Sequence, residues 1–209
     1  MDRLSTQVVV NIVGIMSDII IRNEVHFCDL DSMAGDGDFG MSLAKGFKVV
    51  RNEWEQLPRD EIGHFLTECG MLIIEHCGGA SGPIWGNAFR SMGKYAQGKV
   101  ELNLIEVGEL LQSAIDGIQK CGGAKLGDKT LLDALIPAAE TLKECGASSE
   151  EMISSLKKSA EAAAIGAEKT KEIVATKGRA SYLGERSINY PDAGAMAIGI
   201  IFKGIADRL

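Results

Sequence analysis

The chain has 209 residues with a formal net charge of −7, and its isoelectric point lies near 5.1. An acidic chain without a basic run is poorly suited to bind the phosphates of nucleic acid or an anionic membrane surface, so we expect neither partner. The length is sufficient for one well-buried core, and we expect residues 1–209 to form a single domain.

Apolar residues recur at helical spacing almost throughout the chain, whereas the alternation typical of strands is missing. The sequence therefore predicts an all-α fold. The expected helices cover residues 5–25, 41–56, 60–77, 83–97, 104–120, 129–144, 149–174 and 194–208. Two capping patterns and four glycines mark helix ends: Asn103 with Glu106, Ser148 with Glu151, and Gly78, Gly98, Gly122 and Gly146.

Short connections between these helices favour antiparallel neighbours, in an up-and-down bundle or a ring of helices around a central core. If the helices alternate in direction, every second link emerges at the same end of the molecule. The four links on that end are rich in glycine and charge and cover residues 29–40, 78–82, 121–128 and 177–194. We therefore expect one site at one end of the bundle, with ordinary turns at the other.

The first of these links is strongly acidic. No Lys or Arg lies between Arg22 and Lys45, yet this stretch holds Asp29, Asp31, Asp36 and Asp38, interleaved with Gly35 and Gly37. Carboxylates this close raise one another's pKa unless a cation compensates them, and Mg²⁺ is the hard cation that such oxygens bind. Asp31, Asp36 and Asp38 are spaced to turn toward one metal, while Asp29 is expected at the surface. The alternative is that Asp36 or Asp38 only caps the following helix.

The second link reads Gly78-Gly79-Ala80-Ser81-Gly82 and is followed by Pro83. Successive free amides before a helix start can line a concave site for a phosphate. The spacing does not match the Walker A loop, so a P-loop NTPase is not expected. An ordinary glycine-rich turn is the alternative interpretation.

The third and fourth links offer charges and an apolar wall. Asp128 is a candidate cap for the helix that follows it. Leu131 and Leu132 come next and are expected at the mouth of the site, where an adenine ring needs an apolar wall. Arg179 can either neutralise a phosphate or pair with Glu185.

No protein nucleophile is apparent. The histidines form no metal-binding or catalytic constellation, and Ser181 lacks the G-x-S-x-G context of a hydrolase. Phosphoryl transfer depends largely on positioning and charge neutralisation, so it can proceed without a covalent protein intermediate. We therefore expect metal- and nucleotide-based catalysis.

The cysteines and the apolar segments indicate the compartment. Five cysteines without a C-x-x-C pair fit neither a disulfide framework nor a zinc site. The apolar run 195–202 is far shorter than the roughly 20 residues of a membrane span, and no signal peptide pattern is present. We expect a cytoplasmic protein.

Taken together, four motifs closely resemble the DhaL family, the nucleotide-binding subunits of dihydroxyacetone kinases. They occur in the family's order over nearly the whole chain: Asp31-x4-Asp36-Gly37-Asp38-Phe39-Gly40, Gly78-Gly79-Ala80-Ser81-Gly82-Pro83, Gly127-Asp128-Lys129-Thr130-Leu131 and Lys177-Gly178-Arg179-Ala180-Ser181-Tyr182-Leu183-Gly184.

The resemblance implies an eight-helix antiparallel barrel with a nucleotide and two Mg²⁺ ions at one end. It implies metal binding by Asp31, Asp36 and Asp38. It implies phosphate contacts from Phe39, Gly40, Met41, Ser42, Gly79, Ala80 and Ser81, base or ribose contacts from Gly122 and Leu131, and closure of the site by Arg179, Asp192, Ala193 and Gly194. Two positions depart from the family pattern: Phe39 stands where His or Thr is common, and Ala193 where Pro is common.

The resemblance also implies a reaction and its partners. A phosphohistidine protein of the phosphotransferase system, similar to DhaM, converts bound ADP to ATP, and the γ-phosphoryl group passes to dihydroxyacetone. The ketose is held covalently by a histidine of a partner similar to DhaK. The alternatives are an ATP-exchanging kinase subunit for another ketose such as erythrulose, and an ADP-loaded regulatory module that binds a transcription regulator.

Overall fold

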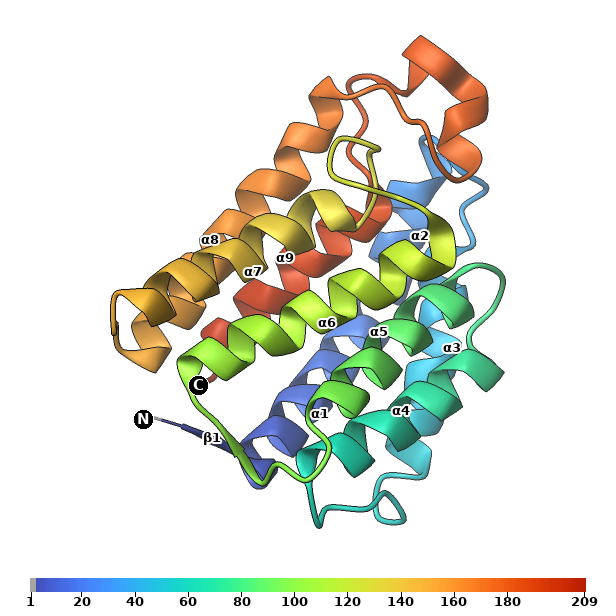
Figure 1. The fold of residues 1–209 in the computed structure, drawn as a ribbon. Coiled ribbons are helices and arrows are strands. Elements are labelled where there is room, and N and C mark those ends of the chain that lie inside the picture. Colours follow the sequence, from blue (N-terminus) through green and yellow to red (C-terminus); the bar gives the residue numbers. More distant parts are fainter. Residues whose placement is uncertain (1–2) are drawn as a thin grey trace.

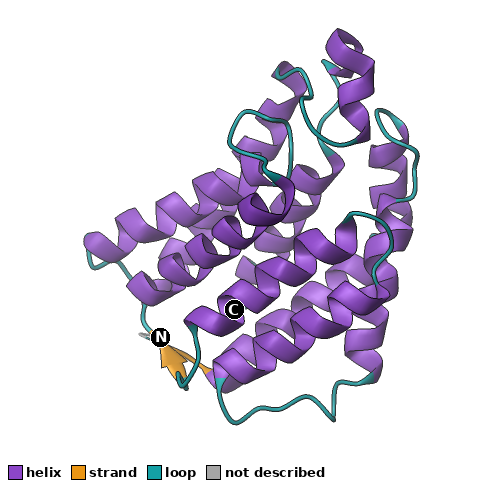
Figure 2. Ribbon diagram, turned by 45° about the vertical axis from the view of Figure 1, so that its right-hand side comes forward, coloured by secondary structure: helices purple, strands orange, loops and turns teal. Residues whose placement is uncertain are grey.

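The computed structural model describes residues 3–209. Almost all of its regular structure is helical (Figure 2). The α-helices in these residues are α1 Thr6–Arg22, α2 Glu24–Ser32, α3 Phe39–Asn52, α4 Ile62–His76, α5 Ser81–Tyr95, α6 Leu104–Gly122, α7 Leu132–Ala147, α8 Met152–Lys169 and α9 Ala193–Ala206. Two 3₁₀ segments follow α8: η1 Thr170–Glu172 and η2 Arg179–Ser187. Two short strands, β1 Leu4–Ser5 and β2 Glu101–Leu102, pair antiparallel. The all-α prediction is confirmed.

Eight of these helices form a closed ring. Around it α1 packs on α3, and each later helix packs on the next, until α9 returns to α1 (Figure 1). Each helix turns its apolar stripe inward, so one continuous cluster of buried side chains fills the ring. Edge-to-face contacts of Phe47 with Trp85 and Phe89 belong to this core. The predicted antiparallel barrel is therefore confirmed.

Helix α2 is the main departure from the predicted elements. The first helix was expected to run to residue 25, with a loop from 29, but α1 ends at Arg22 and α2 continues to Ser32. Asn23 joins the two helices, and its side chain donates a hydrogen bond to the Ile19 carbonyl at 2.8 Å. The junction lacks glycine and proline, so the sequence offers only the weaker helix-end signal of Arg22 followed by Asn23. The α2 helix packs mainly on α3, outside the ring.

Other boundaries also differ from the prediction, by up to five residues. The α5 helix begins at Ser81, two residues earlier than expected, and α7 begins at Leu132, three residues later. The α8 helix ends at Lys169, and the expected loop 177–194 contains η2. Residues 177–194 are therefore more structured than a plain loop.

The capping predictions have mixed outcomes. Asn103 and Glu106 form the expected capping box, with each side chain accepting from the other's backbone amide. The pairing of Ser148 with Glu151 is wrong, because Ser148 ends α7 and Glu151 itself caps α8. Gly146 does not end a helix either. It lies inside α7, where a Cβ would come within 3.0 Å of the Ile105 side chain.

The alternation of direction brings four links to one end of the ring. Helices α3, α5, α7 and α9 all begin there, after the links 33–38, 77–80, 123–131 and 170–192 (Figure 1). This end lies opposite the β1–β2 pair. Among residues 3–209, no helix combines the length and the apolar content needed to cross a membrane.

Candidate metal and nucleotide site

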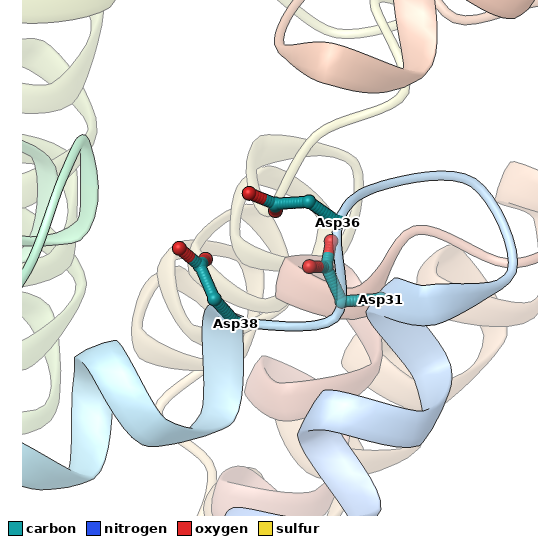
Figure 3. A group of neighbouring side chains, drawn as sticks. All are labelled: Asp31, Asp36 and Asp38. Carbon is teal, nitrogen blue, oxygen red and sulfur yellow. The ribbon is translucent and has the colours of Figure 1, made fainter.

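Three aspartates converge at the end of the ring where the four links meet. Asp31 lies in the last turn of α2, Asp36 in the following link, and Asp38 directly before α3 (Figure 3). Each offers a carboxylate oxygen within 4.8 Å of those of the other two. Asp29 is exposed and lies outside this cluster, as expected. Three hard oxygen donors at this spacing fit a Mg²⁺ ion.

The backbone of the link is shaped around Asp31. Gly37 adopts a left-handed φ of 75°, and its amide donates to Asp31 Oδ2 at 2.9 Å. Gly35 passes so close that an added Cβ would lie 2.2 Å from Asp31 Oδ1. Glycine is therefore needed at both positions. A side chain at Gly35 would displace the Asp31 carboxylate, and one at Gly37 would strain the turn.

The electrostatics of the cluster favour a cation. Burial raises the pKa of Asp31, and the charges of Asp36 and Asp38 raise it further, while backbone amides of Gly37 and Phe39 oppose the shift. The alternative role of a helix cap is not seen. Asp38 occupies the N-cap position of α3, yet its side chain makes no capping hydrogen bond. Asp36 is engaged elsewhere, by Arg179.

Two helix starts lie beside each other at this end. The Gly78 amide donates to the Ser42 carbonyl at 3.2 Å, which joins the link 77–80 to the first turn of α3. A Cβ at Gly78 would lie 2.8 Å from Ser42 Oγ. The first turns of α3 and α5 have amides without intrahelical acceptors, and the helix dipoles favour an anion there. The predicted phosphate-binding residues lie in or next to these turns: Phe39, Gly40, Met41, Ser42, Gly79, Ala80 and Ser81.

The side chain of Phe39 is half-buried and packs against the core. Its ring lies 6.1 Å from that of Phe27, centroid to centroid, and it packs against the buried cluster. Gly40 lies against α2, where a Cβ would come within 1.9 Å of the Glu24 carbonyl oxygen. The Phe39 ring is therefore turned toward the core, and Gly40 has no room for a side chain.

Asp128 does not cap α7, contrary to the prediction. Its carboxylate accepts from the Lys125 amide at 2.9 Å and from the Thr176 hydroxyl at 2.7 Å. The Thr176 hydrogen bond is the main reason that the pKa of Asp128 is lowered. Asp133, in the first turn of α7, instead accepts from the amides of Gly127 and Thr130. The predicted capping role of Asp128 is therefore wrong, and Asp133, for which no role was predicted, contacts the link 123–131 instead.

The expected apolar wall is only partly present. Leu132 is fully buried in the core, so its placement at the mouth was wrong. Leu131 is 8% exposed and lies against the start of α9, where a Cβ on Gly194 would be 3.3 Å from Leu131 Cβ. Gly122, the last residue of α6, faces open space.

The fourth link reaches the acidic cluster. Arg179 Nη1 lies 2.7 Å from Asp36 Oδ2, so Arg179 pairs with the cluster and not with Glu185. Asp192 caps α9 by accepting from the Ala195 amide at 2.7 Å. Burial raises the pKa of Asp192 to about 7, and the charge of Asp31 contributes to this rise. Asp192, Ala193 and Gly194 thus border the same end of the ring as the aspartates.

Lys129 was missed by the sequence analysis, which considered only its neighbour Asp128. Its side chain is 2% exposed. The ammonium group donates to the backbone carbonyls of Thr170, Ile173 and Ser187 at 2.8, 3.0 and 2.7 Å. A lysine in a polar, glycine-containing link is usually exposed, so no local signal could have revealed its burial.

Comparison with known proteins identifies the family. A profile of the DAK2 domain matches residues 33–207. The chain is 34% identical over 206 residues to the Escherichia coli K12 protein named PEP-dependent dihydroxyacetone kinase, ADP-binding subunit DhaL, with 97% of each chain covered. The chain belongs to the DhaL family of kinase subunits. A Listeria innocua DhaL, named as the ADP-binding subunit of PEP-dependent dihydroxyacetone kinase 2, is 33% identical and covers 93% of the chain.

The DhaL fold also occurs in a larger enzyme. The dihydroxyacetone kinase of C. freundii superimposes with a TM-score of 0.78 at 27% identity, covering 97% of this chain and 34% of that one. This chain thus spans about a third of that kinase. A second structure of the same enzyme, in complex with AMP-PNP and Mg²⁺, gives a TM-score of 0.75 at 28% identity.

Proposed function

We propose that this chain is the ADP-binding subunit of a phosphoenolpyruvate-dependent dihydroxyacetone kinase. A phosphohistidine donor similar to DhaM phosphorylates the bound ADP, and the γ-phosphoryl group passes to dihydroxyacetone on a partner similar to DhaK. The observation that supports this proposal most directly is the convergence of Asp31, Asp36 and Asp38 within 4.8 Å, beside the starts of α3 and α5, in a chain of the DhaL family.

The residues divide the work of binding. Asp31, Asp36 and Asp38 hold two Mg²⁺ ions, which neutralise the charge of the nucleotide phosphates. The first turns of α3 and α5 direct backbone amides at those phosphates, with residues 39–42 and 79–81 around them. Gly122 and Leu131 border the base or ribose, and the open space at Gly122 leaves room there. Arg179 and residues 192–194 close the site.

Catalysis in this proposal is electrostatic. A phosphoryl group in transfer carries charge on its peripheral oxygens, and fixed positive groups stabilise it without reorganisation. Arg179 lies where it can supply one of these positive charges, because its guanidinium contacts Asp36 of the cluster. This arrangement needs no covalent protein intermediate.

The reconstituted system tests the donor. The purified chain is expected to retain ADP through gel filtration, and a phosphohistidine donor, not free ATP, should convert it to ATP. Native mass spectrometry reports the nucleotide, the metal count and any bound partner in the same spectrum. Rapid exchange with free ATP would instead identify an ATP-dependent kinase subunit. Tight binding to a transcription regulator without transfer to any ketose would identify a regulatory module.

Substitutions in the cluster test the metal assignment. Asp36→Asn and Asp38→Asn each remove a metal-binding charge, and we expect each to weaken Mg-ADP binding at least about tenfold, or about 1.4 kcal/mol. Isothermal titration calorimetry measures the change. Asp29→Asn is the matched control, because Asp29 lies on the same α2 helix as Asp31 but outside the cluster. If both cluster variants bind as tightly as this control, the metal assignment is wrong.

A further inference from the structure

Lys129 is held in an unusual conformation at the base of the site. Its backbone lies in the left-handed region, with φ 62°, although it is not a glycine. Its side chain is almost fully buried. An ammonium group has three hydrogens to donate, and each of them meets a backbone carbonyl. A strained backbone with a fully satisfied buried charge indicates that the surrounding structure depends on this residue.

The three acceptors belong to two separated parts of the fourth link. Thr170 and Ile173 lie where the chain leaves α8, and Ser187 lies where it returns toward α9. One ammonium group therefore joins both ends of the intervening residues 174–186, which we call the strap. Two further contacts help to close the base, since the Ala175 amide donates to Ser187 Oγ at 3.0 Å and the Asn189 amide donates to the Lys171 carbonyl at 2.8 Å.

The charge on Lys129 is needed for this arrangement. A neutral amine has only two hydrogens, and its lone pair would face one of the carbonyl oxygens. Burial lowers the pKa of Lys129, but the nearby carboxylates of Asp192 and Asp133 oppose that shift. These carboxylates come from the starts of α9 and α7, so the ammonium group lies at the meeting point of three links.

The strap carries Arg179 to the acidic cluster. Arg179 begins η2 and contacts Asp36 across the site, while its side chain remains 68% exposed. An exposed arginine on a long excursion has many available positions, so the base of the strap decides where it can reach. Lys129 fixes that base.

We propose that Lys129 is a positioning residue for Arg179: it clamps the base of the strap and thereby sets where the guanidinium lies during phosphoryl transfer. This inference rests on the proposed function of the site and on the role of Arg179 in it. Lys129 is buried and its three hydrogens are taken by backbone carbonyls, so in this proposal it acts only through the strap.

A double-mutant cycle in the reconstituted kinase complex tests the coupling. Lys129→Met keeps the length of the side chain but removes the three donors, and we expect it to lower kcat by about tenfold to a hundredfold. The affinity for Mg-ADP should change much less, because Asp31, Asp36 and Asp38 are untouched. In a chain that already carries Arg179→Met, adding Lys129→Met should lower kcat by less than about twofold. If the double variant instead lowers kcat by the product of the two single effects, the residues act independently and the inference is wrong.

Two further variants separate positioning from general loss of stability. Lys129→Arg keeps the charge and should recover part of kcat. Ser187→Ala loosens the strap at its other end without touching the lysine, so it should also lower kcat, and only when Arg179 is present. Ser187→Ala therefore tests the coupling between the base of the strap and Arg179 even if Lys129→Met does not fold. Leu142→Ala, in the buried core of α7, is a destabilised control and should leave kcat unchanged below its melting temperature.

Hydrogen–deuterium exchange provides a readout that needs no activity. Lys129→Met should speed exchange in residues 174–186 while α5 and α6 keep their protection. A strap whose exchange is unchanged would overturn the inference even in an active kinase. A wild-type complex that transfers no phosphoryl group would instead overturn the proposed function. If Arg179→Met alone leaves kcat unchanged, Arg179 has no role in phosphoryl transfer. The positioning role of Lys129 is then also wrong.

Discussion

At the acidic cluster, single residues are constrained by contacts with their neighbours in space. Gly35 lies directly against the Asp31 carboxylate, and Gly37 donates to it. Because Gly35 is not in the left-handed region, an alanine there is acceptable to the backbone and only its methyl group is too close. That methyl group would also lie 2.9 Å from the Asp31 backbone oxygen, so the substitution tests the position of Asp31, both its carboxylate and its backbone.

Gly35→Ala should displace the Asp31 side chain and weaken Mg-ADP binding by about tenfold, or about 1.4 kcal/mol. Calorimetric titration with Mg-ADP measures the change. Gly199→Ala in α9 is the control, since its new methyl group meets ordinary contacts of 3.4 Å or more. Equal affinities in the two variants would show that Asp31 does not need its observed position.

Asp192 makes stability depend on pH. Its pKa rises from 3.8 to about 7 on folding, chiefly because it is buried. Between those values the folded chain holds a proton that the unfolded chain has released. The stabilising contribution of this group is therefore complete at low pH and is lost as the pH rises through about 7.

Asp192→Asn should remove this dependence, because asparagine is neutral and can still cap α9. In metal-free buffer, the free energy of unfolding of the wild type should fall relative to the variant between pH 5 and 7, by at most about 1.4 kcal/mol per pH unit. Urea denaturation at several pH values measures this. Asp207→Asn, at the other end of α9, controls for loss of a carboxylate. Parallel pH profiles of wild type and Asp192→Asn would contradict the assignment.

At the scale of elements, glycines set how closely helices approach. A Cβ on Gly63 of α4 would lie 2.6 Å from Gln97 Cα and 2.7 Å from the Gly93 carbonyl oxygen. Gly70 of α4 and Gly86 of α5 face each other in the same way, because a Cβ added to either would lie 2.9 Å from the carbonyl oxygen of the other. Helices α4 and α5 therefore pack backbone to backbone, and the site end of α5 is fixed by that contact.

The same substitution should have opposite effects in two helices. Gly63→Ala overpacks the α4–α5 contact and should cost about 1–3 kcal/mol of the free energy of unfolding. Gly199→Ala fits its surroundings and should add about 0.5–1 kcal/mol through helix propensity. Urea denaturation of both variants measures the difference. Equal stabilities would mean that glycine does not set the α4–α5 distance.

At the scale of the whole molecule, the ring converts distant segments into one site. The links 33–38, 77–80, 123–131 and 170–192 meet only because α9 packs on α1 and closes the ring. Three of these links contact one another: Thr176 donates to Asp128, and Arg179 pairs with Asp36. A ligand that bridges these links should therefore stabilise the entire fold.

Mg-ADP should raise the melting temperature of the chain by mass action. At about a hundred times the dissociation constant the gain is about 2.7 kcal/mol, which corresponds to roughly 5–11 °C for a chain of this size. Differential scanning fluorimetry with Mg-ADP, with each component alone and with a chelator measures the shift. Asp38→Asn, with tenfold weaker binding, should show about half of it. An absent shift at saturating Mg-ADP would contradict a site built by the ring.

Short connections between helices left a bundle and a ring both open, and it was the resemblance to the DhaL family that implied the eight-helix barrel. The sequence alone determined the principal helices, the Asn103–Glu106 capping box and the spacing of the acidic cluster. These features depend on neighbours a few residues apart, because helical periodicity, caps and a tight glycine-containing link are local. The division between α1 and α2 escaped because both segments are helical and the junction has no breaker. The roles of individual site residues in metal and nucleotide binding stay predictions.

Only the tertiary structure decided which partners the links take. The sequence left Arg179 with two possible partners, a phosphate or Glu185, whereas in the fold it pairs with Asp36. In the fold Asp128 also accepts a hydrogen bond from Thr176, and Lys129 is buried at the base of the strap. These contacts join residues dozens to more than a hundred positions apart, and no local pattern encodes them. The physical reason is that burial and ion pairing depend on which surfaces meet when the ring closes, whereas helix formation depends on the residues within each turn.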